Sequence, residues 1–118
     1  MKKQLPQWFA TRGAGCLLHM TSLPSYFGIG NLGKQAYEFL DFLKASGFTS
    51  WQTCPVGPTG FGDSPYQVFS SFAGNPYLID WEPLMTAGLI ENHELEPLYQ
   101  LPRDFVDYGL LYERFFPL

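Results

Sequence analysis

The chain has 118 residues, of which 46% are hydrophobic and 18% aromatic, and its formal net charge is −4. This length corresponds to at most one ordinary domain, and the apolar content excludes a chain that cannot build a hydrophobic core. The acidic balance argues against a nucleic-acid partner, because the seven Lys and Arg residues are scattered and form no basic stripe that would neutralise phosphates.

The sequence predicts a reduced protein of the cytoplasm. Residues 1–12 carry two lysines with no apolar stretch behind them, so we expect no signal peptide. The longest apolar run, residues 14–20, is far shorter than the roughly 20 residues that cross a membrane, which excludes a membrane partner. Cys16 and Cys54 lie in apolar segments, where a free thiol packs as a small hydrophobic side chain, and a disulfide framework usually needs more cysteines.

The first half of the chain predicts a strand–helix–strand unit. The continuous apolar run 14–20 is typical of a strand buried on both faces of a parallel sheet. After a turn-rich stretch, Asn31 is expected to cap a helix that runs to residue 45 and ends at Gly47. One face of this helix would carry apolar residues at helical spacing, namely Ala36, Phe39, Leu40 and Leu43. A second strand over residues 50–56 would pair with the first in parallel, through a right-handed crossover.

The second half of the chain is rich in loops. Residues 55–77 hold many glycines, prolines and aromatic residues with one charge, Asp63, and a connection of this length without periodicity is usually functional when it is not a linker. Asp80 is expected to cap a short helix that ends before Gly88. Residues 91–100 are polar and weakly helical, and Asp107 is the expected cap of a last helix.

Two motifs suggest cofactors, and we assign neither to one. Residues 28–33 match the dinucleotide pattern G-x-G-x-x-G, but the motif begins eight positions after the strand and no acidic residue follows at the required distance. These glycines are therefore expected to serve loop geometry and close packing. Cys16 and His19 have the spacing of half a zinc site, yet residues three apart on a strand point to opposite faces, and no second ligand pair exists. We predict no cofactor and no metal.

The candidate site residues follow the two predicted strands. His19 lies at the carboxyl end of the first strand, where parallel α/β folds place their sites; the alternative is a histidine that only hydrogen-bonds near the rim. The segment 57–67 offers hydroxyl, carboxylate, amide and ring groups, a combination that suits a sugar. We assign Tyr66 to binding, and Phe69 and Phe72 to packing of the loop. Asp63 alone does not supply the two carboxyls that glycosidic chemistry usually needs.

Several strings resemble the 4-α-glucanotransferases (amylomaltase, or disproportionating enzyme). They are RGAGCLLHMTSLP (12–24), FGIGNLG (27–33), WQ (51–52), PVGPTGFGDSPYQ (55–67) and FAGNPYLID (72–80). The match is strongest over residues 12–90 and looser beyond Glu91. The resemblance implies a (β/α)8 barrel of the α-amylase clan type, of which residues 1–118 would form about the first two β/α units. Its substrate would be a maltooligosaccharide, and its other partner the missing C-terminal part of the same barrel.

The resemblance also implies roles for single residues. Ser64 and Tyr66 would bind the donor sugar near the cleaved bond, with Asp63 as their neighbour and His19 assigned with them to substrate binding. Phe61 stands where many members carry Tyr in an accessory glucan site. The family transfers α-1,4-glucan segments by a retaining mechanism with an Asp nucleophile and a Glu acid/base. None of the acids in this chain matches these carboxylates, so no catalytic residue is assigned.

We therefore expect the N-terminal part of a cytoplasmic 4-α-glucanotransferase that is inactive by itself. A complete barrel needs about 250 residues, and an unpaired second strand would be an apolar edge prone to aggregation. A stand-alone glucan-binding or interaction module, and a non-functional truncated remnant, are the alternatives.

Overall fold

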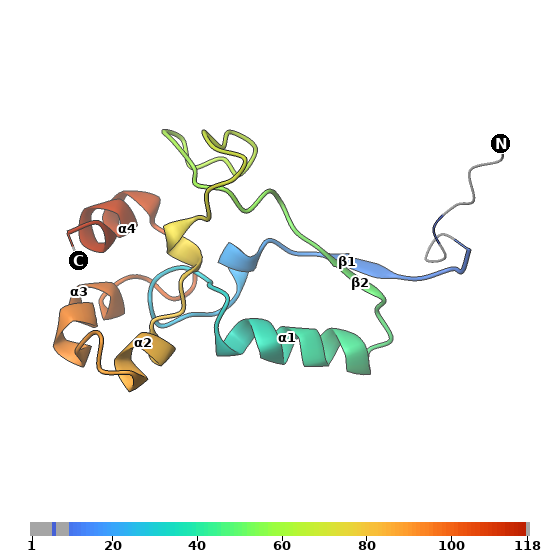
Figure 1. Ribbon diagram of the computed structural model, residues 1–118, viewed down its shortest axis with the longest axis horizontal. Coiled ribbons are helices and arrows are strands. Elements are labelled where there is room, and N and C mark those ends of the chain that lie inside the picture. The colour runs from blue at the N-terminus through green and yellow to red at the C-terminus, as the bar shows by residue number, and fades with distance from the viewer. Residues whose placement is uncertain (1–5, 7–9, 118) are drawn as a thin grey trace.

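The computed structural model describes residue 6 and residues 10–117, so most of the N-terminal stretch that we expect to carry no signal peptide lies outside the described residues. Figure 1 shows the strand pair and α1 on one side of the molecule and the short C-terminal helices gathered on the other. The elements, in chain order, are β1 (Gly15–Leu17), the 3-10 helix η2 (Met20–Ser22), α1 (Lys34–Ala45), β2 (Ser50–Gln52), the 3-10 helix η3 (Pro76–Leu78), α2 (Glu82–Thr86), the 3-10 helix η4 (Asn92–Leu95), α3 (Glu96–Tyr99) and α4 (Tyr108–Phe115).

The predicted parallel strand pair is confirmed. β1 and β2 pair in parallel with Cys16 opposite Trp51, and the ladder continues at both ends through hydrogen bonds from Thr49 N to the Ala14 oxygen (2.8 Å) and from Leu18 N to the Gln52 oxygen (3.0 Å). Each strand has three residues and is shorter than predicted. The first is cut short because the chain turns into η2 at Met20, and Pro55 has no N–H with which to extend the second.

The prediction that the first strand is buried on both faces is wrong for the described chain. Leu17 is 63% exposed, whereas Leu18 and Met20, just beyond the strand, join a small core. α1 covers one side of the pair, where the ring of Phe39 meets Trp51 edge-on at 5.0 Å between centroids. Nothing in the described residues covers the other side in the same way, so the sheet keeps apolar surface.

The two ends of α1 differ in how well their residues were predicted. The N-cap is Gly33 rather than Asn31. Asn31 lies two residues earlier, where its Oδ1 accepts a hydrogen bond from Gly33 N (3.0 Å) and its Nδ2 donates to the Ile79 oxygen (3.2 Å). At the other end, Gly47 has φ 79° and donates to the Lys44 oxygen, as a closing glycine should. The predicted apolar face is correct except at Leu40, which is 46% exposed.

The C-terminal helices begin near the predicted acidic residues. The carboxylate of Asp107 accepts a hydrogen bond from Leu110 N (3.0 Å) and caps α4, as predicted. Asp80 accepts from Glu82 N (3.2 Å), although the N-cap of α2 is Trp81, and this helix ends before Gly88. The larger core of the protein lies here, around the fully buried side chains of Leu95, Leu98 and Leu111.

The glycines of the 28–33 motif serve packing, as predicted. Gly28 has φ 77°, and a Cβ there would clash with the side chain of Leu101. A Cβ on Gly30 would meet the backbone of Met20 and Leu23. These glycines therefore let the loop between η2 and α1, which we call the first loop, lie against the C-terminal core. Among the helices of the described residues, none has the length and apolar content to cross a membrane.

Candidate functional site

The segment that follows β2 forms an exposed loop, residues 57–74, which we call the aromatic loop. It folds back on itself through an antiparallel bridge between Thr59 and Val68. Its tip is a tight turn in which Asp63 N donates to the Gly60 oxygen (3.1 Å), and Gly62 has the positive φ (94°) that such a turn requires at its third position. Figure 1 shows this loop, drawn green to yellow, projecting beyond the strands and the neighbouring helices.

Two of the predicted site residues lie together on this loop. The Ser64 Oγ accepts a hydrogen bond from Tyr66 N (3.3 Å), and the hydroxyl of Tyr66 donates to Cys54 Sγ (3.5 Å). The hydrogen bond to Cys54 raises the pKa of the Tyr66 phenol, with smaller contributions from the thiol charge and from desolvation. The Tyr66 side chain is 73% exposed, so the structure presents a neutral phenol ring beside a serine.

Asp63 lies in a neighbouring groove of about 1000 Å³ between the aromatic loop and α4. Three tyrosines line this groove, Tyr77, Tyr108 and Tyr112, together with Phe61. Burial raises the pKa of Tyr77 to about 12, and the negative charges of Asp63 and of the other two phenols, when ionised, act in the same direction. The groove therefore combines aromatic faces, phenol hydroxyls and a carboxylate.

Sequence reasoning did not identify the α4 wall of this groove. Tyr108, Tyr112 and Phe116 recur every four residues, and all three line the groove. This spacing places side chains on one face of a helix and would have indicated a shared surface. It does not show that the surface faces Asp63, which lies 45 positions earlier in the chain.

The assignment of Phe69 and Phe72 to packing of the loop is wrong. Phe69 is 73% exposed and Phe72 is fully exposed, because the loop is held by backbone bonds and has no core of its own. Phe69 instead lines the groove together with Phe61, whose side chain is also fully exposed. Exposed rings at this density suit a ligand with apolar faces.

His19, predicted at the carboxyl end of a strand over residues 14–20, lies two residues beyond the shorter β1 and is half-buried. Its Nδ1 has no hydrogen-bond partner among the described residues, and burial lowers the pKa of the imidazole below its usual value. His19 does not line the groove that holds Asp63. Its assignment to substrate binding remains a prediction. Within the described part of the chain, no three His, Cys, Asp or Glu side chains gather as metal ligands would.

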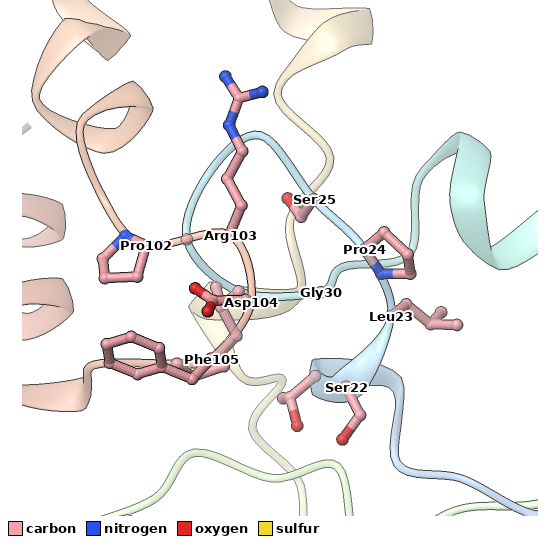
Figure 2. Close-up of a pocket in the computed structure, with 13 residues that line it drawn as sticks. Ser22, Leu23, Pro24, Ser25, Gly30, Pro102, Arg103, Asp104 and Phe105 are labelled. Atoms are coloured by element: carbon pink, nitrogen blue, oxygen red, sulfur yellow. The ribbon is translucent and has the colours of Figure 1, made fainter.

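A second, smaller cavity of about 280 Å³ lies between the first loop and residues 102–106 (Figure 2). Ser22, Ser25 and Asp104 line it, and none of the predicted site residues does. Figure 2 shows the guanidinium of Arg103 pointing away from Ser22 and Asp104. It lies 4.9 Å from the centroid of the Tyr26 ring, as a cation–π contact requires. The polar groups of this cavity therefore do not converge on one point.

A parallel strand–helix–strand unit defines an α/β protein, and aromatic rings, phenol hydroxyls and a carboxylate gather in the groove between the aromatic loop and α4. The family model for 4-alpha-glucanotransferase matches residues 18–115. The chain belongs to this family.

Its relatives support the same assignment. The chain is 55% identical over 101 residues to the 4-alpha-glucanotransferase of Thermus thermophilus, a match that covers 86% of this chain and 19% of that protein. It is 51% identical over 104 residues to the enzyme of the same name from Aquifex aeolicus (strain VF5), covering 86% of this chain and 21% of the relative. The chain spans about a fifth of the length of these curated relatives.

A solved structure shares this arrangement. The amylomaltase from Streptococcus agalactiae in complex with acarbose is 42% identical and superposes with a TM-score of 0.83, covering 91% of this chain and 22% of that one. The strand pair, the aromatic loop and the C-terminal helices therefore match an arrangement found in an amylomaltase.

Proposed function

We propose that this chain supplies the first two β/α units of a 4-α-glucanotransferase barrel, with residues 1–118 as part of that domain. The complete protein would transfer α-1,4-glucan segments between maltooligosaccharides in the cytoplasm. The observation that carries the proposal is the pair of half-buried Ser64 and exposed Tyr66, which lies next to the end of β2 in a chain of this family. Parallel barrels place their catalytic residues at the carboxyl ends of the strands.

Each proposed binding group has a chemical role at a sugar. The Tyr66 ring offers an apolar face to the C–H face of a glucose unit, and its phenol and the Ser64 hydroxyl can exchange hydrogen bonds with sugar hydroxyls. His19, at the end of the neighbouring strand, would reach the same substrate from β1. A retaining transfer proceeds by two displacements at one carbon and needs two carboxyls on either side of the bond. We assign this pair to other strands of the barrel, because no acid of this chain fits it.

The groove between the aromatic loop and α4, which Asp63 lines, would hold a second stretch of glucan. Its tyrosine rings and its carboxylate, which accepts hydrogen bonds only, suit the alternating apolar faces and hydroxyl rims of a sugar chain. Phe61 keeps a ring where many members of the family carry Tyr, so stacking would remain while a phenol hydrogen bond would be lost. Binding in this groove is therefore expected to be weaker than with Tyr at this position.

The experiment uses the product of the complete reading frame that contains this chain (the complete gene product). Incubated with maltotriose, it should release glucose and form longer maltooligosaccharides, whereas the 118-residue chain should form neither. Retention of amylose by the gene product without any transfer would favour the stand-alone glucan-binding module instead. Neither transfer nor binding would contradict both functions.

A further inference from the structure

The hydroxyl of Tyr66 is tied to a residue that the family resemblance does not assign. Tyr66 donates to Cys54 Sγ at 3.5 Å, across 12 positions of the chain. Its backbone N–H is held by Ser64, so the two contacts act at opposite ends of the residue. The ring between them is 73% exposed and gains little support from packing. The position of the phenol therefore depends strongly on Cys54.

Cys54 is attached to the more rigid part of the molecule. It follows β2 by two residues and is half-buried. β2 is fixed through Trp51, whose Nε1 donates to the Leu18 oxygen at 2.7 Å and whose ring packs edge-on against Phe39. The thiol thus belongs to the edge of the sheet, whereas Tyr66 belongs to the exposed loop. Their contact joins the loop to the sheet next to the proposed sugar site.

A thiol has chemistry that suits this position. While the phenol donates its proton to sulfur, the phenol oxygen can still accept a hydrogen bond from a sugar hydroxyl, so the sugar can bind without breaking the contact with Cys54. Serine would also accept the bond, but alanine would leave the hydroxyl without a partner. The contact also raises the pKa of the Tyr66 phenol above its ordinary value.

We propose that Cys54 is a positioning residue for Tyr66, holding its phenol where the donor sugar binds. The inference rests on the proposed function of Tyr66. A neutral hydrogen bond changes an equilibrium constant by about three- to tenfold. We therefore expect Cys54→Ala to raise the KM for maltotriose by about three- to tenfold, with a smaller change in kcat, because the acceptor is lost while the catalytic groups stay in place.

A double-mutant cycle on the complete gene product tests the pairing, with Cys54→Ala, Tyr66→Phe and the double variant. In the Tyr66→Phe background, Cys54→Ala should have no further effect on KM, because the donor is already absent. Cys54→Ser should restore most of the wild-type KM, and Cys16→Ala, at the half-buried cysteine of β1, is the matched control that should leave it unchanged. Equal effects of Cys54→Ala in both backgrounds, or no effect in either, would overturn the proposal.

A second measurement separates this proposal from the proposed function. The phenolate absorbance of the wild type minus that of Tyr66→Phe isolates the titration of Tyr66. The same difference taken in the Cys54→Ala background should titrate at lower pH, because the hydrogen bond that raises the pKa is gone. An unchanged Tyr66 pKa overturns the positioning role even if the enzyme is active. A wild type that titrates as expected but transfers no sugar contradicts the function and leaves the contact established.

Discussion

The indole Nε1 of Trp51 donates a 2.7 Å hydrogen bond to the carbonyl oxygen of Leu18. This bond reaches from β2 to the residue immediately after β1. At this point the two strands end, and the chain continues toward η2 after β1 and toward the aromatic loop after β2 (Figure 1). It extends the three-residue ladder at the edge where the candidate site begins. Trp51 therefore stabilises both the strand pair and the base of the site.

Replacing Trp51 with Phe should destabilise the complete gene product by about 1–2 kcal/mol, because a ring remains against Phe39 while the Leu18 oxygen loses its partner. Urea denaturation measures this as a lower midpoint at unchanged slope. Trp81→Phe is the control, since Trp81 packs against Phe115 at the other core. If the two variants lose the same stability, the indole hydrogen bond contributes nothing specific.

Tyr66→Ala should lower kcat/KM for maltotriose by more than about tenfold, which is roughly 1.4 kcal/mol of transition-state binding. The reason is the loss of an exposed ring and phenol that the structure holds beside Ser64. Initial rates of glucose release provide the measurement. Tyr37→Ala removes an equally exposed tyrosine from α1 and should leave the rate unaltered. Unchanged kinetics of Tyr66→Ala would show that this residue does not bind the donor.

The structural features that could be predicted from the sequence are those formed by residues close to one another in the chain. Gly47 ends α1 and Asp107 caps α4 because the bonds concerned join residues at most a few positions apart. The parallel strand pair was also predictable, since a helix of this length returns the chain in the same direction. Asn31 missed the cap position by two residues, because its side chain satisfies Gly33 N and Ile79 instead.

The groove could not be predicted, because its walls come from distant segments. Asp63 and Tyr112 share it only because the C-terminal helices fold back against the first loop, where Gly28 packs on Leu101. Three-residue spacing predicted packing for Phe69 and Phe72, yet the loop has no helix and no second layer to receive their rings. Spacing indicates which residues share a face, whereas burial depends on what lies opposite.

The 118-residue chain alone should unfold without a sharp transition. Leu17, Leu40 and Phe42 are 46–63% exposed, so the strand pair and α1 leave apolar surface that nothing in the described residues covers. Such a surface favours association and loose packing over a single cooperative state. Differential scanning calorimetry should show a broad transition, and size-exclusion chromatography should show aggregates. A monomer with a sharp, reversible melt would contradict this expectation.

Alkaline pH should destabilise the complete gene product through Tyr77. Its pKa is about 12 in the folded protein and about 10 when unfolded, so between these values only the unfolded state loses the proton. The stabilisation is thus complete below pH 10 and is lost as pH rises toward 12, by about 3 kcal/mol in total. Over this range the urea midpoint of the wild type should fall relative to that of Tyr77→Phe, which has no phenol to titrate, with Tyr37→Phe as the control at an exposed position. Parallel curves would show that Tyr77 titrates normally.

Acidic pH should act through His19 in the opposite direction. Burial lowers the pKa of its imidazole below 6.5, so the unfolded chain takes up a proton before the folded protein does. The contribution of His19 is therefore complete above pH 6.5 and is lost as pH falls through its folded pKa. The free energy of unfolding should fall more steeply between pH 7.5 and about 5 in the wild type than in His19→Gln. His93→Gln, at an exposed histidine 3.1 Å from Glu91, is the control. If maltotriose binding weakens over this pH range in the wild type but not in His19→Gln, the titration of the imidazole is linked to substrate binding.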